Sequence, residues 1–275
     1  MHMTGEMLLE VDHLSVSFRM YRNALTHMMS AGVNDVSLRL HRGEIIAVVG
    51  ASGSGKSLLA HAVLGILPYN AVTAGEMRYR GAPLDAARQK ELRGRELALI
   101  PQSVTYLDPL MRVGAQVRGL HGSQEDMEAT LRRLHLDAHV ADLYPFQLSG
   151  GMARRVLFST AVITDAALII ADEPTPGMDV GSAAAALRIL RELADTGKGV
   201  LLITHDIDLA VEVADTVAVF YEGRTVDMVP AAAFRGDGTA LAHPYTRALY
   251  RALPQNGFAC YTAEEVRRMT AAGGA

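Results

Sequence analysis

The stretch that decides the fold is IIAVV (45–49), followed directly by GASGSGKS (50–57) and SLLAHAVLGIL (57–67). The first segment is continuously apolar, which is typical of a strand buried on both faces, and the last has the apolar spacing of a helix. The glycine-rich segment between them matches the pattern G-x-x-x-x-G-K-[ST] in the strand–loop–helix context that this pattern requires. The sequence therefore predicts a loop whose backbone N–H groups surround a phosphate.

This loop carries the residue types that bind the phosphates of a nucleotide. Lys56 is expected to reach the β- and γ-phosphates, and the Ser57 hydroxyl is expected to bind Mg²⁺. The positive end of the helix that begins near Gly55 adds to the attraction for an anion. The alternative is an ordinary glycine-rich turn, and the flanking strand and helix disfavour it. The residues expected around the phosphates are Gly50, Ala51, Ser52, Gly53, Ser54, Gly55, Lys56, Ser57 and Leu58.

Strand-like and helical patterns alternate along most of the chain. LLEVDHLSVSF (8–18) and DVSLRL (35–40) alternate apolar and polar residues, which predicts two half-exposed strands. Buried strands that alternate with helices are typical of an α/β domain with a mostly parallel sheet. Further buried strands are predicted at 96–100, 167–171, 199–204 and 216–221, and further helices at 182–194 and 207–214.

The pattern changes in the middle and near the end of the chain. Strand signals fade between about 103 and 164, where QEDMEATLRRLHL (124–136) predicts a helix. From about residue 231 glycine and proline interrupt short helical segments. We expect a single domain over 1–275, with a core at about 1–102 and 165–230, an inserted helical subdomain at about 103–164 and an appendage at about 231–275.

The composition excludes several classes of protein. Among 275 residues, 26 basic and 30 acidic side chains give a formal net charge of −4, so there is no basic surface signal and no nucleic-acid partner is expected. One cysteine, Cys260, cannot form an internal disulfide or a thiol-rich zinc cluster. The apolar runs are far shorter than the roughly 20 residues that span a bilayer. Any role at a membrane is therefore expected to come through a partner.

Polar side chains follow three of the predicted strands, at the edge where ligands bind in open α/β sheets. ALIIADEP (167–174) places Asp172 and Glu173 at a strand end, where Asp172 is expected to hold Mg²⁺ and Glu173 to act as general base. His205 follows the strand at 199–204 and is expected to contact the γ-phosphate and orient the attacking water. Gln102 follows a further strand and is expected to supply an oxygen to Mg²⁺. Taken singly, these residues also fit structural roles. Asp172 and Glu173 fit a solvated strand end, His205 fits a hydrogen-bonded position in the core, and Gln102 alone carries little information.

LSGGM (148–152) is a second glycine-containing loop that opens a predicted helix. A serine and two glycines before a helix again suit a phosphate. One nucleotide already has its loop, and no second loop of this kind with a lysine is present. The simplest interpretation is that LSGGM closes over the nucleotide of a second subunit.

With these motifs in this order, the chain resembles the ATP-binding cassette family over about 8–250. The resemblance implies a P-loop NTPase (RecA-like) core, an antiparallel β subdomain and an inserted α-helical subdomain. It also implies Mg-ATP hydrolysis in a head-to-tail dimer with an identical or paralogous ATPase subunit, coupled to membrane-spanning partners. The positions that match the family's motifs are Lys56, Gln102, Ser149, Gly150, Gly151, Asp172, Glu173, Asp179 and His205.

The resemblance further implies an aromatic residue near the first strand that stacks on adenine. Phe18 matches that place best and Tyr21 is the second choice, although either one also fits a role in the core. In two places the chain departs from the family's pattern. Gly177, in TPGMD, has no side-chain hydroxyl to make a contact across the dimer, and Met152 and Ala153 replace more usual polar residues. These departures bear on how closely two ATP sites communicate.

The segments QSVTYLDPLMRVGAQV (102–117) and HPYTRALYRALPQNGF (243–258) resemble the peptide and nickel importer branch. That resemblance implies permease subunits that contact the first segment, an extracytoplasmic substrate-binding protein, and a peripheral position on the cytoplasmic face of the inner membrane. Peptide importers of this branch often bind an iron–sulfur cluster with several cysteines in their tail. Because Cys260 is the single cysteine, a nickel or metal–metallophore cargo is favoured over a peptide.

Two other classes of function stay open. The first is a soluble, non-transport cassette ATPase in which ATP gates binding to nucleic acid or ribosomes, and the second is a P-loop kinase. The chain lacks the second cassette or long coiled coil of the former, and LSGGM has no role in the latter. His135 and His139 are four residues apart in a segment expected to be helical, which places them on one face. A surface position is the preferred interpretation, and a metal site is the alternative.

Overall fold

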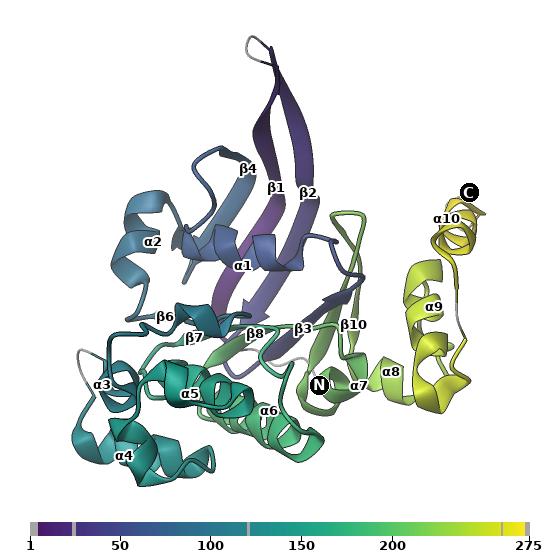
Figure 1. Ribbon diagram of the computed structural model, residues 1–275. Helices are drawn as coiled ribbons and strands as arrows, with labels where there is room; N and C mark the ends of the chain where they lie inside the picture. The colour runs from purple at the N-terminus through teal and green to yellow at the C-terminus, as the bar shows by residue number, and fades with distance from the viewer. Residues whose placement is uncertain (1–4, 24–25, 120–121, 260, 273–275) are drawn as a thin grey trace.

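The computed structural model describes residues 5–23, 26–119, 122–259 and 261–272. Its strands form two sheets, one of them mostly parallel (Figure 1). The antiparallel sheet has the order β2-β1-β4-β5, formed by β1 (Met7–Asn23), β2 (Thr26–His41), β4 (Ala71–Tyr79) and β5 (Ala82–Pro83). The other sheet has the order β10-β9-β3-β8-β7-β6, formed by β3 (Ile45–Gly50), β6 (Leu97–Ile100), β7 (Leu168–Asp172), β8 (Gly199–Ile203), β9 (Thr216–Tyr221) and β10 (Arg224–Pro230). In that sheet the β10–β9 pair alone is antiparallel.

The helices lie around these sheets, and those of the inserted segment gather beside the β6 edge of the large sheet (Figure 1). Among the described residues no helix is long and apolar enough to cross a membrane. The α-helices are α1 (Lys56–Leu64), α2 (Ala86–Leu92), α3 (Val113–Arg118), α4 (Gln124–Arg133), α5 (Gly150–Val162), α6 (Val180–Asp195), α7 (Ile207–Val213), α8 (Ala232–Arg235), α9 (Pro244–Ala252) and α10 (Ala263–Ala272).

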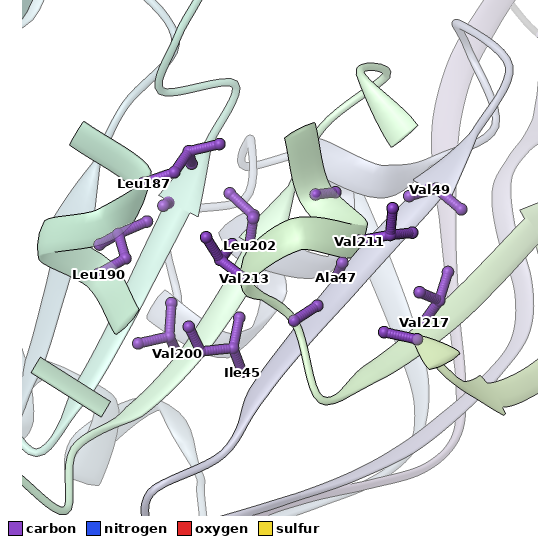
Figure 2. Close-up of a cluster of buried hydrophobic side chains, with 14 of the residues drawn as sticks. Ile45, Ala47, Val49, Leu187, Leu190, Val200, Leu202, Val211, Val213 and Val217 are labelled. Atoms are coloured by element: carbon purple, nitrogen blue, oxygen red, sulfur yellow. The ribbon is translucent and has the colours of Figure 1, made fainter. Parts of the chain in front are cut away.

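The central strand β3 is buried on both faces, because alternate side chains enter two different apolar clusters. Ile45, Ala47 and Val49 pack toward α6 and α7, as Figure 2 shows. Ile46 and Val48 pack on the other side with α1 and the antiparallel sheet. Each fully buried aliphatic side chain of this kind stabilises the fold by about 1.5–3 kcal/mol. The continuous apolar run of β3 follows from this double burial, and it fixes the position of the loop that comes next.

The inserted segment has an apolar cluster of its own. Residues from α3, α4 and α5 meet in it, and the members lie apart from the two clusters around β3. Its buried members are Leu107, Val113, Val117, Met127, Leu131, Leu136, Val140, Ala153, Val156 and Leu157. This separate core is consistent with the subdomain boundaries expected from the sequence, which stay a prediction.

The predicted fold class is confirmed, since the structure combines a mostly parallel sheet, an antiparallel sheet and helices. The sequence patterns missed three strands, which are β4, β5 and β10. They also underestimated the antiparallel pair, because β1 has 17 residues and β2 has 16. The helix predicted at 124–136 ends earlier, at Arg133, and His135 has a positive φ of 54°. Pairing between distant strands, rather than local periodicity, decides the differences among the strands.

Candidate functional site

The glycine-rich loop connects β3 to α1 and leaves the start of that helix open. Gly55 is the N-cap residue, with φ +93°, and α1 has neither a side-chain cap nor an acidic residue in its first turn. The first N–H groups of a helix need acceptors from outside it. Together with the positive end of the helix dipole, these N–H groups favour an anion at this point.

Two glycines of this loop are required by the chain's own backbone. A Cβ atom on Gly50, where φ is +151°, would lie 2.2 Å from the Phe220 carbonyl oxygen. A Cβ on Gly55 would lie 2.6 Å from Val33 and 2.8 Å from the Gly32 carbonyl oxygen. Any larger residue at either position forces the backbone apart, so the shape of the loop depends on glycine.

Lys56 is held inside the loop. Its side chain is buried, and its ammonium donates hydrogen bonds to the carbonyl oxygens of Gly50 (2.8 Å) and Ala51 (3.0 Å). Burial lowers the pKa of Lys56, while the nearby carboxylates of Glu173 and Asp172 act in the opposite direction. A cation is therefore fixed in place beside the open end of α1.

Ser57 and Asp172 meet beside this lysine. The Ser57 hydroxyl donates a hydrogen bond to the Asp172 carboxylate over 3.0 Å, although the two residues are 115 positions apart in the sequence. Burial raises the pKa of Asp172, and the hydrogen bond from Ser57 opposes that effect. A carboxylate and a hydroxyl at hydrogen-bond distance are the hard oxygen donors that Mg²⁺ prefers, so this pair fits the ion.

Glu173 lies next to this pair in a strained conformation. It has φ +48°, in the left-handed region that non-glycine residues rarely adopt, and its N–H donates to the Ile203 carbonyl oxygen at 2.8 Å. Its buried carboxylate contacts Nδ1 of His205 at 2.8 Å. An ionised carboxylate only accepts, so Nδ1 of His205 is the donor in this contact. Strain of this kind is characteristic of functional sites.

The residues predicted from four separate motifs line one open cavity of about 540 Å³. Gln102 lies on its wall with an exposed side chain. The described residues that line the cavity are Ser52, Gly53, Gly55, Lys56, Ser57, Leu58, Gln102, Glu173 and His205. Asp172 joins them through Ser57.

Phe18 lies close to the end of the loop. A Cβ on Gly32 would approach Phe18 to 2.9 Å and Leu58 to 2.6 Å, so this glycine leaves room for both side chains. Phe18 is half-buried against the cluster that contains α1. The side chain of Tyr21, the second choice, lies outside the described side chains.

The LSGGM loop does not line this cavity. Ser149 caps α5, since its hydroxyl accepts a hydrogen bond from the Met152 N–H at 3.3 Å. Ser149 and Gly150 are exposed, and a Cβ on Gly150 would have no atom within 4 Å among the described residues. Within one chain the loop therefore contributes nothing to the cavity at its own phosphate loop.

Sequence reasoning misplaced one pair of residues and missed one contact. His135 and His139 do not share a helical face, because α4 ends before both of them, but both are exposed, as the preferred interpretation predicted. No group of metal-ligating side chains is found among the described residues. The missed residue is Tyr245, whose hydroxyl contacts the phosphate loop. Cys260 lies outside the described residues.

The sequence profile of the family described as ABC transporter matches residues 33–176, more than half of the chain. The chain belongs to the ABC transporter family. Within this family it is 36% identical over 271 residues to the oligopeptide transport ATP-binding protein OppD of Lactococcus lactis subsp. cremoris (strain SK11), covering 92% of this chain and 77% of that protein. It is also 36% identical to the dipeptide transport ATP-binding protein DppD of Escherichia coli (strain K12), covering 90% and 79%.

Solved structures of ABC cassettes share the fold. A dimeric post-hydrolysis structure of the ATP-binding cassette MJ0796 with ADP and Pi matches 82% of this chain and 99% of its own, with a TM-score of 0.71 and 21% identity. An ATP-binding subunit of an ABC transporter matches 96% of this chain with a TM-score of 0.67 and 24% identity. As a member of the ABC transporter family, the chain is an ATPase whose hydrolysis of ATP drives transport.

Proposed function

We propose that this ABC ATPase is the ATP-binding subunit of an importer of peptides. The observation that carries this proposal is the likeness to OppD, DppD and a putative peptide import ATP-binding protein of Brucella abortus (strain 2308), which is 34% identical over 90% of this chain. The single cysteine, Cys260, favoured a nickel or metal–metallophore cargo. The names of these relatives do not support that cargo, and it stays a prediction.

ATP binds with its phosphates in the loop from Gly50 to Leu58. The open N–H groups of α1 and the buried ammonium of Lys56 supply the positive potential that a triphosphate needs. The Ser54 hydroxyl is buried and has no hydrogen-bond partner among the described residues, so the loop retains a polar group for a further ligand. Phe18, which lies near Leu58, contacts the adenine ring.

Mg²⁺ is held by the Ser57 hydroxyl, the Asp172 carboxylate and the side-chain oxygen of Gln102. Ser57 and Asp172 are already within 3.0 Å of each other, and Gln102 lies on the wall of the same cavity. The ion supplies charge neutralisation for the phosphate oxygens. Since Mg²⁺ commonly keeps water and phosphate ligands, a few protein oxygens suffice.

Glu173 takes the proton of the attacking water, and His205 orients that water against the γ-phosphate. The Glu173 carboxylate is buried, held by His205 at 2.8 Å and placed by a strained backbone, so its position is defined before the nucleotide arrives. A general base that is placed in advance loses little free energy to reorganisation. Glu173, His205 and Lys56 are the proposed catalytic residues.

A second ATPase subunit completes the site. Ser149, Gly150 and Gly151 lie at the start of α5 and do not line the cavity of their own phosphate loop, and Ser149 and Gly150 are exposed. In a head-to-tail pair they close over the partner's nucleotide. The partner is either a second copy of this chain or a paralogue.

The permease subunits contact the segment after Gln102, at the cytoplasmic face of the membrane. Tyr106, Leu110 and Met111 are exposed by 57%, 87% and 44%, an apolar group that a membrane-bound partner would cover. The complex receives its cargo from an extracytoplasmic substrate-binding protein. The rival function, a soluble cassette that gates nucleic-acid or ribosome binding, has no support in the acidic net charge of −4.

Uptake by cells tests the cargo. Cells that lack this subunit are supplied with the wild-type chain or with Lys56→Ala, and the uptake of labelled peptides and of nickel is measured. We expect the wild type, and not Lys56→Ala, to restore peptide uptake while nickel uptake is the same in both. Restoration of nickel uptake alone would replace the peptide proposal by the nickel prediction, and salt-sensitive nucleic-acid binding by the purified chain would favour the rival.

A further inference from the structure

The segment after β10 reaches the phosphate loop through the side chain of Tyr245. Tyr245 lies near the start of α9, and its hydroxyl accepts a hydrogen bond from the Ala51 N–H at 3.0 Å. The two residues are 194 positions apart. Figure 1 shows α9 beyond β10, at the edge of the large sheet. This contact joins the C-terminal appendage to the first peptide group after β3.

The position of Tyr245 is determined on three sides. Its backbone N–H donates to Nδ1 of His243 at 3.2 Å, and Pro244 occupies the first turn of α9, so the start of the helix is defined. The fully buried Thr246 donates to Asp227 of β10 at 2.9 Å. The Tyr245 ring lies 4.4 Å from the ring of Tyr221, centre to centre, at the end of β9. Only 5% of Tyr245 is exposed.

The Tyr245 hydroxyl and the Lys56 ammonium bind opposite ends of the same peptide group. The N–H of Ala51 and the carbonyl of Gly50 belong to the same planar peptide unit. Tyr245 accepts from the N–H end, and Lys56 donates to the carbonyl end at 2.8 Å. The Ala51 carbonyl in turn accepts from Lys56 at 3.0 Å and from the Ser54 N–H at 3.2 Å. A rotation of this peptide unit would disturb the lysine and the loop together.

We propose that Tyr245 is a positioning residue for nucleotide binding: its hydroxyl fixes the Gly50–Ala51 peptide and so keeps the loop in the shape that receives phosphates. The inference rests on the proposed role of the phosphate loop. A loop that is ordered before binding pays less conformational entropy when the nucleotide arrives. Burial raises the pKa of Tyr245, so the phenol stays protonated at neutral pH and keeps this geometry. The appendage thereby influences the affinity of the site without touching the nucleotide.

The alternative is that the hydroxyl only satisfies a buried N–H group. Both roles predict a loss of stability in Tyr245→Phe, because the Ala51 N–H loses its acceptor. The two roles differ in what they predict for nucleotide affinity at temperatures well below melting. If the bond is purely structural, Tyr245→Phe leaves this affinity unchanged. Tyr250→Phe is the matched control: in the same helix, the Tyr250 hydroxyl donates to the Gly236 carbonyl oxygen at 2.7 Å, away from the loop.

The experiment is a calorimetric titration of the purified full chain with ATP and with ADP in the presence of Mg²⁺. We expect Tyr245→Phe to raise both Kd values about three- to tenfold, the worth of one neutral hydrogen bond, and Tyr250→Phe to change them less than twofold. Thermal unfolding without nucleotide verifies that both variants are folded. A Tyr245→Phe affinity within twofold of the wild type, or an equal loss in Tyr250→Phe, overturns the proposal.

A third variant separates this proposal from the one on which it rests. Lys56→Ala is expected to weaken ATP binding strongly. If it does so while Tyr245→Phe binds like the wild type, only the positioning role fails. If Lys56→Ala leaves the affinity unchanged, the phosphate loop is not the nucleotide site and both proposals fail.

Discussion

The phosphate loop (50–57) and the LSGGM loop (148–152) both place glycines before a helix, but their surroundings differ. In the phosphate loop, a Cβ on Gly50 or Gly55 would meet backbone oxygen atoms of the same chain at 2.2 or 2.8 Å. In the LSGGM loop, a Cβ on Gly150 would meet nothing within 4 Å, and one on Gly151 would meet only the Gly177 carbonyl oxygen, at 3.7 Å. Gly150 and Gly151 also have no positive φ.

The difference separates two reasons for a glycine. Folding requires Gly50 and Gly55 of the phosphate loop, because an added Cβ would clash with Phe220 of β9 or with Gly32 and Val33 of β2. The packing of the chain gives no reason for Gly150 or Gly151. Their small size is explained by close approach of something outside the chain, as the proposed trans arrangement requires. Substitutions in the two loops should therefore separate folding from function.

The largest effect is expected at Glu173, on the phosphate-loop side. Glu173→Gln keeps the size and the hydrogen-bonding capacity of the side chain but removes the base, so turnover should fall about 10²–10⁴-fold while ATP still binds. Steady-state hydrolysis and nucleotide titration of the same preparation measure the two quantities. Unchanged turnover would remove Glu173 from its role. The trapped nucleotide should also make dimers of this variant easier to detect.

A smaller loss of turnover, about 10²-fold, is expected from Ser149→Arg in the LSGGM loop. The bulky cation should prevent ATP-driven dimerisation, measured by light scattering, and leave the affinity of the monomer for ATP largely intact. Ser149→Ala is the control, because it loses the same cap of α5, worth about 0.5–2 kcal/mol, without the added bulk. Dimerisation of Ser149→Arg at the wild-type level would contradict the trans arrangement.

Glycine-to-alanine substitutions in the two loops should have different effects on the free energy of unfolding. Gly55→Ala should lower the free energy of unfolding by about 1–3 kcal/mol, because it adds a clash and a left-handed alanine. Gly150→Ala should leave stability equal or raise it by less than about 1 kcal/mol, because alanine favours the helix and meets no neighbour. Urea unfolding measures both. Equal losses of unfolding free energy in the two variants would contradict the inference that folding requires Gly55 but not Gly150.

The smallest effect is expected from the buried charge of Asp172. Burial raises its pKa, so the stability that protonation provides is present below the ordinary carboxyl pKa and is lost as pH rises through the raised value. Asp172→Asn should therefore stabilise the nucleotide-free chain at pH 7 by about 0.5–2 kcal/mol, a gain that disappears in acid. Stabilisation by Mg-ATP should be lost in the same variant.

Asp137→Asn is the control for this measurement, since Asp137 is exposed and its side chain caps no helix. It should change stability little at either pH. A loss of stability in Asp172→Asn at pH 7 would show that the carboxylate holds the loop together rather than opposing the fold.

Strand–loop–helix segments were the most predictable parts of the chain. The strand predicted at 45–49 agrees with β3 to within one residue, and the predicted loop follows it directly. Burial on both faces leaves a continuous apolar run in the sequence, which is why this strand could be predicted. Strand β4, AVTAGEMRY, has no such signal, and most of it is not buried. Its conformation follows from pairing with β1. Strand β10 likewise depends on its antiparallel partner β9.

By itself, the sequence determined the order of the motifs and their places at strand and helix ends, because glycine, lysine and carboxylate spacing is a local property of the chain. Only the tertiary structure decided which of these groups touch. The contacts of Ser57 with Asp172, Glu173 with His205 and Ala51 with Tyr245 join residues 115, 32 and 194 positions apart. Such contacts arise when parallel strands end at one sheet edge and a distant helix packs against it, and no local pattern encodes that packing.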